Sequence, residues 1–252
     1  MAKEDAENLI VNFIRDRVEA AGAKGAVLGL SGGLDSATVA FLAARALGPD
    51  RVLALLLPEA GVTPPEDVED ARQVASILGI ESAEMDISGV LGGYFEVLPA
   101  AGVPRLVNGN LKARVRMTIL YWHANLLHRL VLGTGNRTEI MLGYSTKFGD
   151  GAADLLPISG LYKDEVRDLA RSLGVPDRIL EKAPTAGLWP GQTDEEELGI
   201  TYHDADAILR SLEEGRGSED LAAEFGEDKL AVILRRIEGG RHKRQLPPTP
   251  EG

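Results

Sequence analysis

The most informative absence from this sequence is cysteine. None occurs in 252 residues, which excludes disulfide bonds, a thiolate nucleophile and thiolate metal ligands. Basic residues are also in deficit, with 27 Lys and Arg against 39 Asp and Glu and a net charge of −12. Because affinity for nucleic acid rests largely on Lys and Arg at the phosphate backbone, we expect no nucleic-acid partner.

A long apolar core is also missing from the N-terminal segment. Residues 1–20 therefore do not fit a signal peptide or a membrane span, and their mixed charges indicate an amphipathic helix. With 44% hydrophobic residues the chain can bury a substantial core. We expect a soluble, cytoplasmic protein with no membrane partner, in which residues 1–252 form a single domain with a polar C-terminal tail from about residue 241.

What the sequence does contain is an alternation of apolar runs of strand length with stretches of helical periodicity. This pattern is typical of a parallel sheet covered by helices. We therefore expect an α/β fold, a doubly wound parallel sheet with helices on both faces. Strands are predicted over 25–30, 51–58, 81–87 and 130–134, and helices over 36–47, 64–79, 110–127 and much of the chain after 202.

The segment GLSGGLDSA, residues 29–37, places two glycines, two serines and an aspartate between a predicted strand and a predicted helix. The first N–H groups of a helix lack intrahelical partners and attract anions, so phosphate is the expected ligand. Gly32 and Gly33 allow close approach of the backbone, and Ser31 and Ser36 supply hydroxyl donors. An ordinary helix start that binds nothing is the alternative for these residues.

Asp35 distinguishes this turn from the common phosphate-binding loops. A carboxylate among phosphates would repel them unless a divalent cation lay between, so Asp35 is interpreted as a Mg²⁺ ligand. The turn matches neither G-x-x-x-x-G-K-[ST] nor G-x-G-x-x-G. It resembles instead the SGGxDS loop of the ATP pyrophosphatases, which cleave ATP between its α and β phosphates.

A second polar region follows the last predicted strand. Glu139 comes shortly after the strand end at Thr134 and a glycine-rich turn, so we expect it in the same crevice as Asp35. Carboxylates from two strand ends could share one Mg²⁺. Further charged residues follow in a glycine-rich segment, where they are either functional groups or ordinary solvated loop charges: Lys147, Asp150, Asp154 and Lys163.

Several segments of the chain resemble, in order, those of the ammonia-dependent NAD synthetases. The matching segments are GLSGGLDSA, NLKARVRM, GTGNRTE with GYSTKFGDGAAD, KAPTAGLW with QTDEEELGITY, and RHKRQLPP. The resemblance implies an adenine nucleotide alpha hydrolase-like, Rossmann-like fold and a homodimer with the substrate near the subunit interface. It also implies that deamido-NAD, ATP and ammonia give NAD, AMP and pyrophosphate through an adenylylated nicotinate carboxylate.

The resemblance assigns roles to individual residues. Asp35 and Glu139 would hold Mg²⁺, and Asp150 and Lys163 would be catalytic, with Asp150 near the incoming ammonia. The implied ATP contacts are Gly29, Leu30, Ser31, Gly32, Gly33, Leu34, Asp35, Ser36, Thr134, Lys163 and Thr185. The implied deamido-NAD contacts are Arg114, Lys147, Asp154, His242 and Lys243. The segment 188–199 would close over the site and shield the acyl-adenylate from water.

Two other functions remain open at this point. One is a different ATP pyrophosphatase that acts on a nucleobase or RNA, which the acidic balance and the absence of cysteine disfavour. The other is a nucleotide-binding module without activity, which the second carboxylate and the cluster from Lys147 to Lys163 disfavour. Because the matched segments leave no room for an amidase and there is no cysteine nucleophile, we expect ammonia rather than glutamine to be the nitrogen source.

Overall fold

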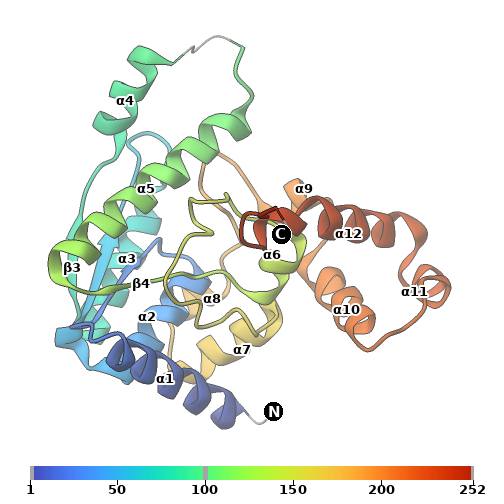
Figure 1. Cartoon of the computed structure of the whole chain (residues 1–252), viewed down its shortest axis with the longest axis horizontal. Helices are drawn as coiled ribbons and strands as arrows, with labels where there is room; N and C mark the ends of the chain where they lie inside the picture. Colours follow the sequence, from blue (N-terminus) through green and yellow to red (C-terminus); the bar gives the residue numbers. More distant parts are fainter. Residues whose placement is uncertain (1–2, 99–101, 251–252) are drawn as a thin grey trace.

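A four-stranded parallel sheet forms the centre of the protein (Figure 1), for which we use a computed structural model that describes residues 3–98 and 102–250. The strand order is β3-β2-β1-β4. β1 and β2 are apolar throughout and buried, as expected for parallel strands covered on both faces. The strands are β1 (Ala26–Gly29), β2 (Val52–Leu56), β3 (Glu81–Glu84) and β4 (Leu130–Leu132).

Helices cover both faces of this sheet, which confirms the predicted doubly wound architecture. Successive side chains of a strand point to opposite faces. Accordingly Leu28 of β1 packs in the core under one group of helices, whereas Val27 packs in the core under the other. The first group is α1 (Lys3–Ala20), α2 (Leu34–Leu47), α3 (Pro65–Leu78), α7 (Lys163–Leu173) and α8 (Asp177–Leu180), and the second is α4 (Ser88–Val97) and α5 (Arg105–Leu127).

A third hydrophobic core lies beside the sheet, in the C-terminal helices seen at the right of Figure 1. Its largest fully buried side chains are Leu198, Ile208 and Leu209. The helices around it are α6 (Arg137–Leu142), α9 (Asp194–Leu198), α10 (Tyr202–Glu213), α11 (Ser218–Phe225) and α12 (Glu227–Gly239). Short 3-10 turns lie at η1 (Pro49–Arg51) and η2 (Arg241–Lys243).

The observed boundaries differ from the predicted ones in ways that matter for the site. α2 begins at Leu34 rather than at residue 36, so Asp35 lies in its first turn. β4 ends at Leu132 because Asn136 starts a new helix, α6, with a capping box to Glu139. α5 begins at Arg105, directly after a proline, and α4 was not predicted. Residues 1–2 of the predicted first helix and 251–252 of the tail lie outside the described residues.

The sheet brings the two polar regions of the sequence together. β1 and β4 are adjacent and parallel, with Leu28 opposite Leu132. Their carboxyl ends therefore lie at the same edge, where the strand order places a crevice between the loops that follow them. Within the described ranges, no helix has the length and apolar character needed to cross a bilayer.

Candidate active site

The turn from Ser31 to Gly33 is held in one conformation by its own hydrogen bonds. The Ser31 and Ser36 hydroxyls lie 3.0 Å apart, Ser36 Oγ donates to the Gly33 carbonyl at 3.0 Å, and Gly33 N–H donates to Ser31 Oγ at 3.2 Å. Gly32 has φ +79°, and a Cβ there would lie 2.1 Å from the Asp67 carbonyl oxygen. Only glycine fits such a position without displacing α3.

The start of α2 is suited to an anion. Its N-cap is Gly33, and no hydrogen bond from a described side chain caps it. The N–H groups of the first turn therefore face the cavity without a side-chain partner, and the helix dipole favours negative charge there. An open helix start of this kind is compatible with a phosphate cradle, and phosphate binding here stays a prediction.

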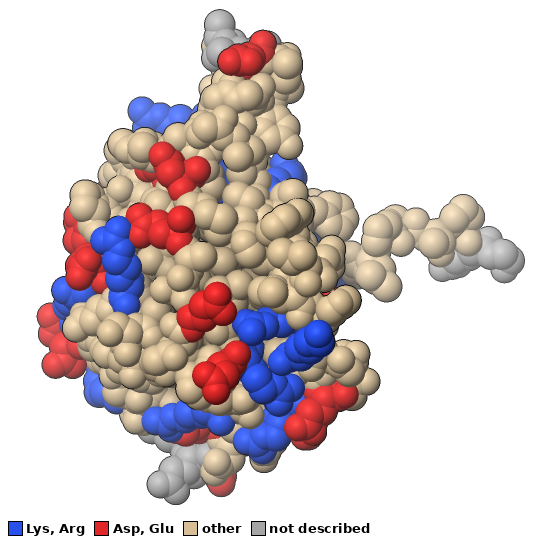
Figure 2. Space-filling model, turned by 90° about the vertical axis from the view of Figure 1, so that its left-hand side faces the viewer, with Lys and Arg blue, Asp and Glu red and all other residues tan. Residues whose placement is uncertain are grey.

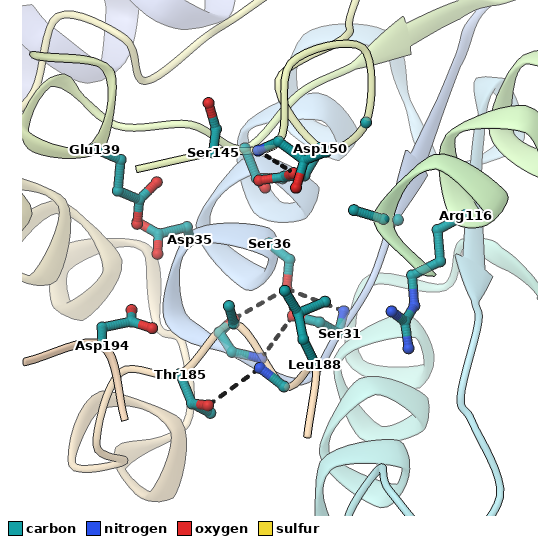
Figure 3. Close-up of a pocket in the computed structure, with 18 of the residues that line it drawn as sticks. Ser31, Asp35, Ser36, Arg116, Glu139, Ser145, Asp150, Thr185, Leu188 and Asp194 are labelled. Atoms are coloured by element: carbon teal, nitrogen blue, oxygen red, sulfur yellow. Dashed lines mark hydrogen bonds between the residues drawn. The ribbon is translucent and has the colours of Figure 1, made fainter. Parts of the chain in front are cut away.

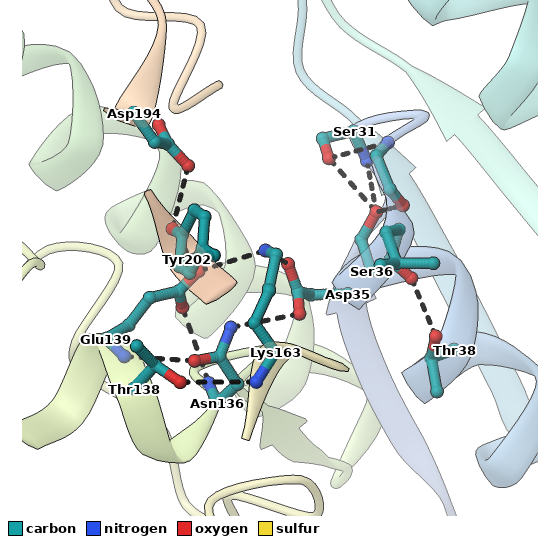
Figure 4. A network of polar contacts seen from close by, with 12 residues as sticks. Ser31, Asp35, Ser36, Thr38, Asn136, Thr138, Glu139, Lys163, Asp194 and Tyr202 are labelled. Carbon is teal, nitrogen blue, oxygen red and sulfur yellow. Dashed lines mark hydrogen bonds and ion pairs between the residues drawn. The ribbon is translucent and has the colours of Figure 1, made fainter. Parts of the chain in front are cut away.

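Asp35 and Glu139 meet across the edge of the sheet at the Lys163 ammonium (Figure 4). Lys163 Nζ lies 2.5 Å from Asp35 Oδ2 and 3.3 Å from Glu139 Oε1. Asn136 Nδ2 donates to the other Asp35 oxygen at 3.1 Å. The structure therefore brings together three predicted site residues, Asp35, Glu139 and Lys163, and adds Asn136, which was not predicted.

The electrostatics of this group show an excess of buried negative charge. Burial raises the pKa of Glu139 to about 8; Lys163 opposes this rise, whereas Asp35 and Asp194 add to it. Burial alone would lower the pKa of Lys163, but the Asp35 and Glu139 carboxylates outweigh it and raise that pKa above its ordinary value. The carboxylates of Asp35 and Glu139 thus share one ammonium group, that of Lys163.

Asp194 and Tyr202 belong to the same group, although the sequence did not predict them as site residues. Asp194 is buried, and its carboxylate accepts from Tyr202 Oη and from Tyr144 Oη, each at 3.0 Å. Tyr202 Oη also lies 3.4 Å from Glu139 Oε1, and Lys163 Nζ lies 4.8 Å from the centre of the Tyr202 ring. Both residues lie in the segment QTDEEELGITY, which resembles the NAD synthetases, but the resemblance assigned no role to either, and an acidic run is equally typical of an exposed helix start.

Asp35, Glu139, Lys163 and Asp194 line one cavity of about 470 Å³ (Figure 3). Its walls come from the two loops at the sheet edge, from α5 with Arg116, and from the segment that carries Thr185 and Leu188. The predicted site residues that line it are Gly29, Leu30, Ser31, Gly33, Leu34, Asp35, Ser36, Thr134, Glu139, Asp150, Lys163, Thr185 and Lys243. Gly32, Arg114, Lys147, Asp154 and His242 are outside the lining.

Three of those outlying residues form a connected row near the cavity. An Arg114 guanidinium N–H donates to the Lys147 carbonyl at 3.2 Å, and Lys147 Nζ donates to the His242 carbonyl at 2.7 Å. Lys243, the next residue, donates to the carbonyls of Gly143 and Ser145 at 2.7 and 2.6 Å. The C-terminal segment from η2 is therefore fixed to the loops around the cavity.

Asp154 and Asp150 have different surroundings. Asp154 accepts from the Val131 N–H at 2.7 Å and from Tyr121 Oη at 3.3 Å, so in this chain it braces β4. Asp150 accepts from the Thr146 N–H at 2.8 Å while remaining open to the cavity. The surrounding protein desolvates its carboxyl and raises its pKa, which these hydrogen bonds oppose.

Asp35 and Glu139 fit the donor set that Mg²⁺ requires. Mg²⁺ is typically held by one or two carboxylates together with substrate phosphates and water, rather than by a protein cage. The surplus negative charge on Asp35, Glu139 and Asp194, against the single ammonium of Lys163, would be relieved by a divalent cation.

An open helix start, a glycine turn and paired carboxylates at one edge of a parallel sheet define a nucleotide-binding α/β protein. The family described as NAD synthase matches residues 7–247. The chain is 52% identical to the NH(3)-dependent NAD(+) synthetase of Methanosarcina acetivorans over 98% of both chains. This chain belongs to the NAD synthase family. Membership of this family does not favour the two alternative functions, a pyrophosphatase that modifies a nucleobase or RNA and a nucleotide-binding module without activity.

Solved structures agree with this assignment and confirm the fold. The NMN synthetase of Francisella tularensis matches over 100% of both chains with a TM-score of 0.89 and 36% identity. The NH3-dependent NAD synthetase of Campylobacter jejuni, in complex with a nitrate ion, matches over 100% of both chains with a TM-score of 0.84 and 31% identity. The expected adenine nucleotide alpha hydrolase-like fold is therefore the fold of this chain.

Proposed function

We propose that this protein is a ligase that uses ATP and ammonia to amidate deamido-NAD, giving NAD, AMP and pyrophosphate. The observation that carries the proposal is the placing of an open helix start, α2, beside Asp35, Glu139 and Lys163 in one cavity. That arrangement suits a triphosphate whose α-phosphate must be approached by another anion. The relative from Methanosarcina acetivorans named above is an NH(3)-dependent NAD(+) synthetase.

In the first step the nicotinate carboxylate attacks the α-phosphorus of ATP, and pyrophosphate leaves. The two reacting groups are both anionic, so the protein must neutralise charge and fix their positions. The turn at Ser31–Gly33 and the first N–H groups of α2 would hold the phosphates, and the Lys163 ammonium would offset their charge. The role of Thr134 and Thr185, which line the same cavity, would be to orient ATP.

In the second step ammonia attacks the activated carbonyl carbon, and AMP leaves with one former carboxylate oxygen. Ammonium must lose a proton before it can attack, and Asp150 is the candidate acceptor because it is open to the cavity. The raised pKa of its carboxyl, which is caused by burial, makes it a better base than an ordinary aspartate.

Asp35 and Glu139 are the residues that would hold Mg²⁺. When bound, the ion would neutralise phosphate charge and help pyrophosphate to leave. The deamido-NAD substrate would lie along the row of Arg114, Lys147 and the His242–Lys243 segment, which supplies positive charge in an acidic protein. The proposed role of Asp154 in this subsite is to hold the strand end that borders it.

The segment 188–199 would cover the activated intermediate. Lys112 Nζ donates to the Leu188 carbonyl at 2.8 Å, and the Leu188 N–H donates to Gln192 Oε1 at 2.7 Å. Gln192 in turn donates to Glu197 Oε2 at 2.7 Å. The Lys112 bond holds the start of the segment against α5, and the two Gln192 bonds brace the segment internally. A segment held in this way would exclude water that competes with ammonia.

A homodimer is supported by the outer surfaces of α4 and α5. Trp122 and Leu126 of α5 are each 60% exposed, and Figure 2 shows that uncharged residues cover most of the side on which α4 and the carboxyl-terminal part of α5 lie. Other large apolar side chains exposed on these two helices are Val90, Tyr94, Val97, Leu106 and Val107. An apolar surface of this kind is typical of an interface between subunits. We also propose a cytoplasmic location.

The proposal is tested by product formation with the purified protein. We expect NAD, AMP and pyrophosphate in equal amounts from ATP, deamido-NAD and an ammonium salt, and no comparable rate with glutamine. Nicotinate mononucleotide is the necessary comparison substrate, because a close structural neighbour is an NMN synthetase. Faster turnover of the mononucleotide would replace deamido-NAD as the substrate, and no pyrophosphate with either would remove the ligase assignment.

A further inference from the structure

The helix α10 reaches the candidate active site through two side chains that lie one turn apart. Tyr202 and Asp206 are both buried, with Asp206 only 1% exposed, and both face α6 and α7 rather than solvent. Residues four apart on a helix lie on the same face. α10 therefore presents a polar pair to the two helices that carry Glu139 and Lys163.

Asp206 binds the residues that stand next to Glu139 and Lys163. Its Oδ1 accepts from Thr138 Oγ1 at 2.5 Å, and its Oδ2 accepts from the Asp164 N–H at 3.1 Å. Thr138 Oγ1 in turn accepts from the Lys163 N–H at 3.2 Å. Figure 4 shows Thr138 between Glu139 and the backbone of Lys163.

These contacts satisfy N–H groups that α7 cannot satisfy itself. Lys163 and Asp164 are its first two residues, and the first N–H groups of a helix have no intrahelical acceptor. Here the acceptors come from α6, through Thr138, and from α10, through Asp206. The three helices are thus joined at the point where the Glu139 and Lys163 side chains leave the backbone.

Tyr202 contacts the charged ends of the Glu139 and Lys163 side chains. Its hydroxyl donates to Asp194 and lies 3.4 Å from Glu139 Oε1, and its ring lies under the Lys163 ammonium. Tyr202 thus contacts the charged ends of Glu139 and Lys163, while Asp206 holds their backbone ends.

A buried carboxylate is a costly way to join helices. Burial raises the pKa of Asp206 to about 6, even though the bonds from Thr138 and the Asp164 N–H oppose the rise. The Arg210 guanidinium binds the neighbouring Asp164 carboxylate at 2.6 and 2.9 Å. Its positive charge offsets only part of the rise in the pKa of Asp206. A carboxyl whose pKa is raised in the folded protein costs folding free energy when it is ionised, so stability alone does not explain an aspartate here.

We infer that Asp206 is a positioning residue for the nucleotide site, which acts through Thr138 and the Asp164 N–H to set Glu139 and Lys163 in register with Asp35. The inference rests on the proposed function, since positioning is measured as a change in its rate. Asp206, Thr138 and Asp164 are outside the lining of the cavity.

The test is Asp206→Asn, which keeps the shape and one acceptor and removes the charge. We expect kcat to fall about tenfold or more and the KM for deamido-NAD to stay within about twofold. The melting temperature should stay within a few degrees of wild type, because the loss of one buried acceptor and the removal of the buried charge have opposite effects on stability. Asp204→Asn is the matched control, because Asp204 lies on the same helix, away from α6 and α7, and pairs with Lys229 at the surface. The control should keep the wild-type kcat.

Thr138 provides an independent second test should Asp206→Asn fail to fold. Thr138→Val removes the hydroxyl and should lower kcat, while Thr138→Ser restores the hydroxyl and should recover most of it. Wild-type kcat in folded Asp206→Asn, or equal kcat in the two Thr138 variants, would overturn the inference. An inactive wild-type protein would instead overturn the proposed function, so the two failures are distinguishable.

Discussion

The turn after β1, residues 29–37, and the C-terminal helices α10–α12 contribute to the same site in different ways. The turn after β1 supplies its groups from nine consecutive residues, with backbone N–H groups, glycines and short polar side chains. The unit of α10–α12 supplies Tyr202 and Asp206, which reach Glu139 and Thr138 across separations of 63 and 68 residues. In the proposed function the turn would hold the ligand directly, whereas Tyr202 and Asp206 contact residues of the site or their neighbours.

This difference explains which part of the site could be predicted. A phosphate turn is local chemistry, because strand, glycines and helix start must follow each other along the chain. A positioning contact depends on where two distant helices meet, and its residues are indistinguishable in sequence from other polar residues on an amphipathic helix. Motifs therefore identify the groups that touch substrate better than they identify their supports.

The largest effect should come from the carboxylates that the proposal assigns to Mg²⁺. Asp35→Asn and Glu139→Gln should each lower pyrophosphate release about 1000-fold or more, because charge neutralisation at the triphosphate is lost. Burial raises the pKa of Glu139 above its ordinary value, so ionised Glu139 costs folding free energy and Glu139→Gln should fold about as stably as wild type. Steady-state pyrophosphate assays and thermal unfolding measure the two quantities. Near-normal turnover in either variant would remove that residue from the site.

The turn itself should be almost as sensitive to a single methyl group. Gly32→Ala would place a Cβ 2.1 Å from the Asp67 carbonyl at a φ of +79°, so the turn must move, and kcat/KM for ATP should fall about 100-fold. Gly48→Ala is the matched control, because Gly48 has φ +80° and open space around its Cα. The control should lose about 1 kcal/mol of stability but little activity. Equal kinetics in the two variants would contradict the role of the turn.

A smaller effect is expected in the pH dependence of stability at Asp206. Burial raises its pKa from 3.8 to about 6, so its proton leaves the unfolded chain more readily than the folded one. The wild type should therefore lose stability relative to Asp206→Asn as pH rises from about 4 to 6, by on the order of 2 kcal/mol, with no further change above that range. Urea unfolding of both proteins at several pH values measures the difference. A constant difference across the range would show that the Asp206 carboxyl is not perturbed.

The smallest effect should be a change in the KM for one substrate, deamido-NAD, and not in the KM for the other, ATP. Arg114→Ala and Lys147→Ala should raise the KM for deamido-NAD about tenfold and leave the KM for ATP nearly unchanged, since both residues lie outside the lining of the cavity. Initial rates with each substrate varied in turn provide the measurement. If both KM values rise together, these residues support the fold or the ATP site instead.

Much of the fold followed from the sequence, because buried parallel strands and the helices between them have clear periodic patterns. β1, β2 and β4, the phosphate turn and the meeting of Asp35 with Glu139 were all predicted, and the parallel order of β1 and β4 accounts for that meeting. α4 was missed because its sequence SGVLGGYFEV contains three glycines, which weaken any helical signal. Asp194 was missed because burial by Tyr144 and Tyr202 arises only from tertiary contact.

The most direct measurement is the fate of the carboxylate oxygens of deamido-NAD. The proposed chemistry joins one of them to the α-phosphorus of ATP and leaves it there when ammonia displaces AMP. With ¹⁸O in the nicotinate carboxylate, mass spectrometry should find one ¹⁸O atom in each AMP formed and one in the amide of NAD. AMP that carries no ¹⁸O, or ADP formed together with labelled phosphate, would show that this site does not adenylylate its substrate.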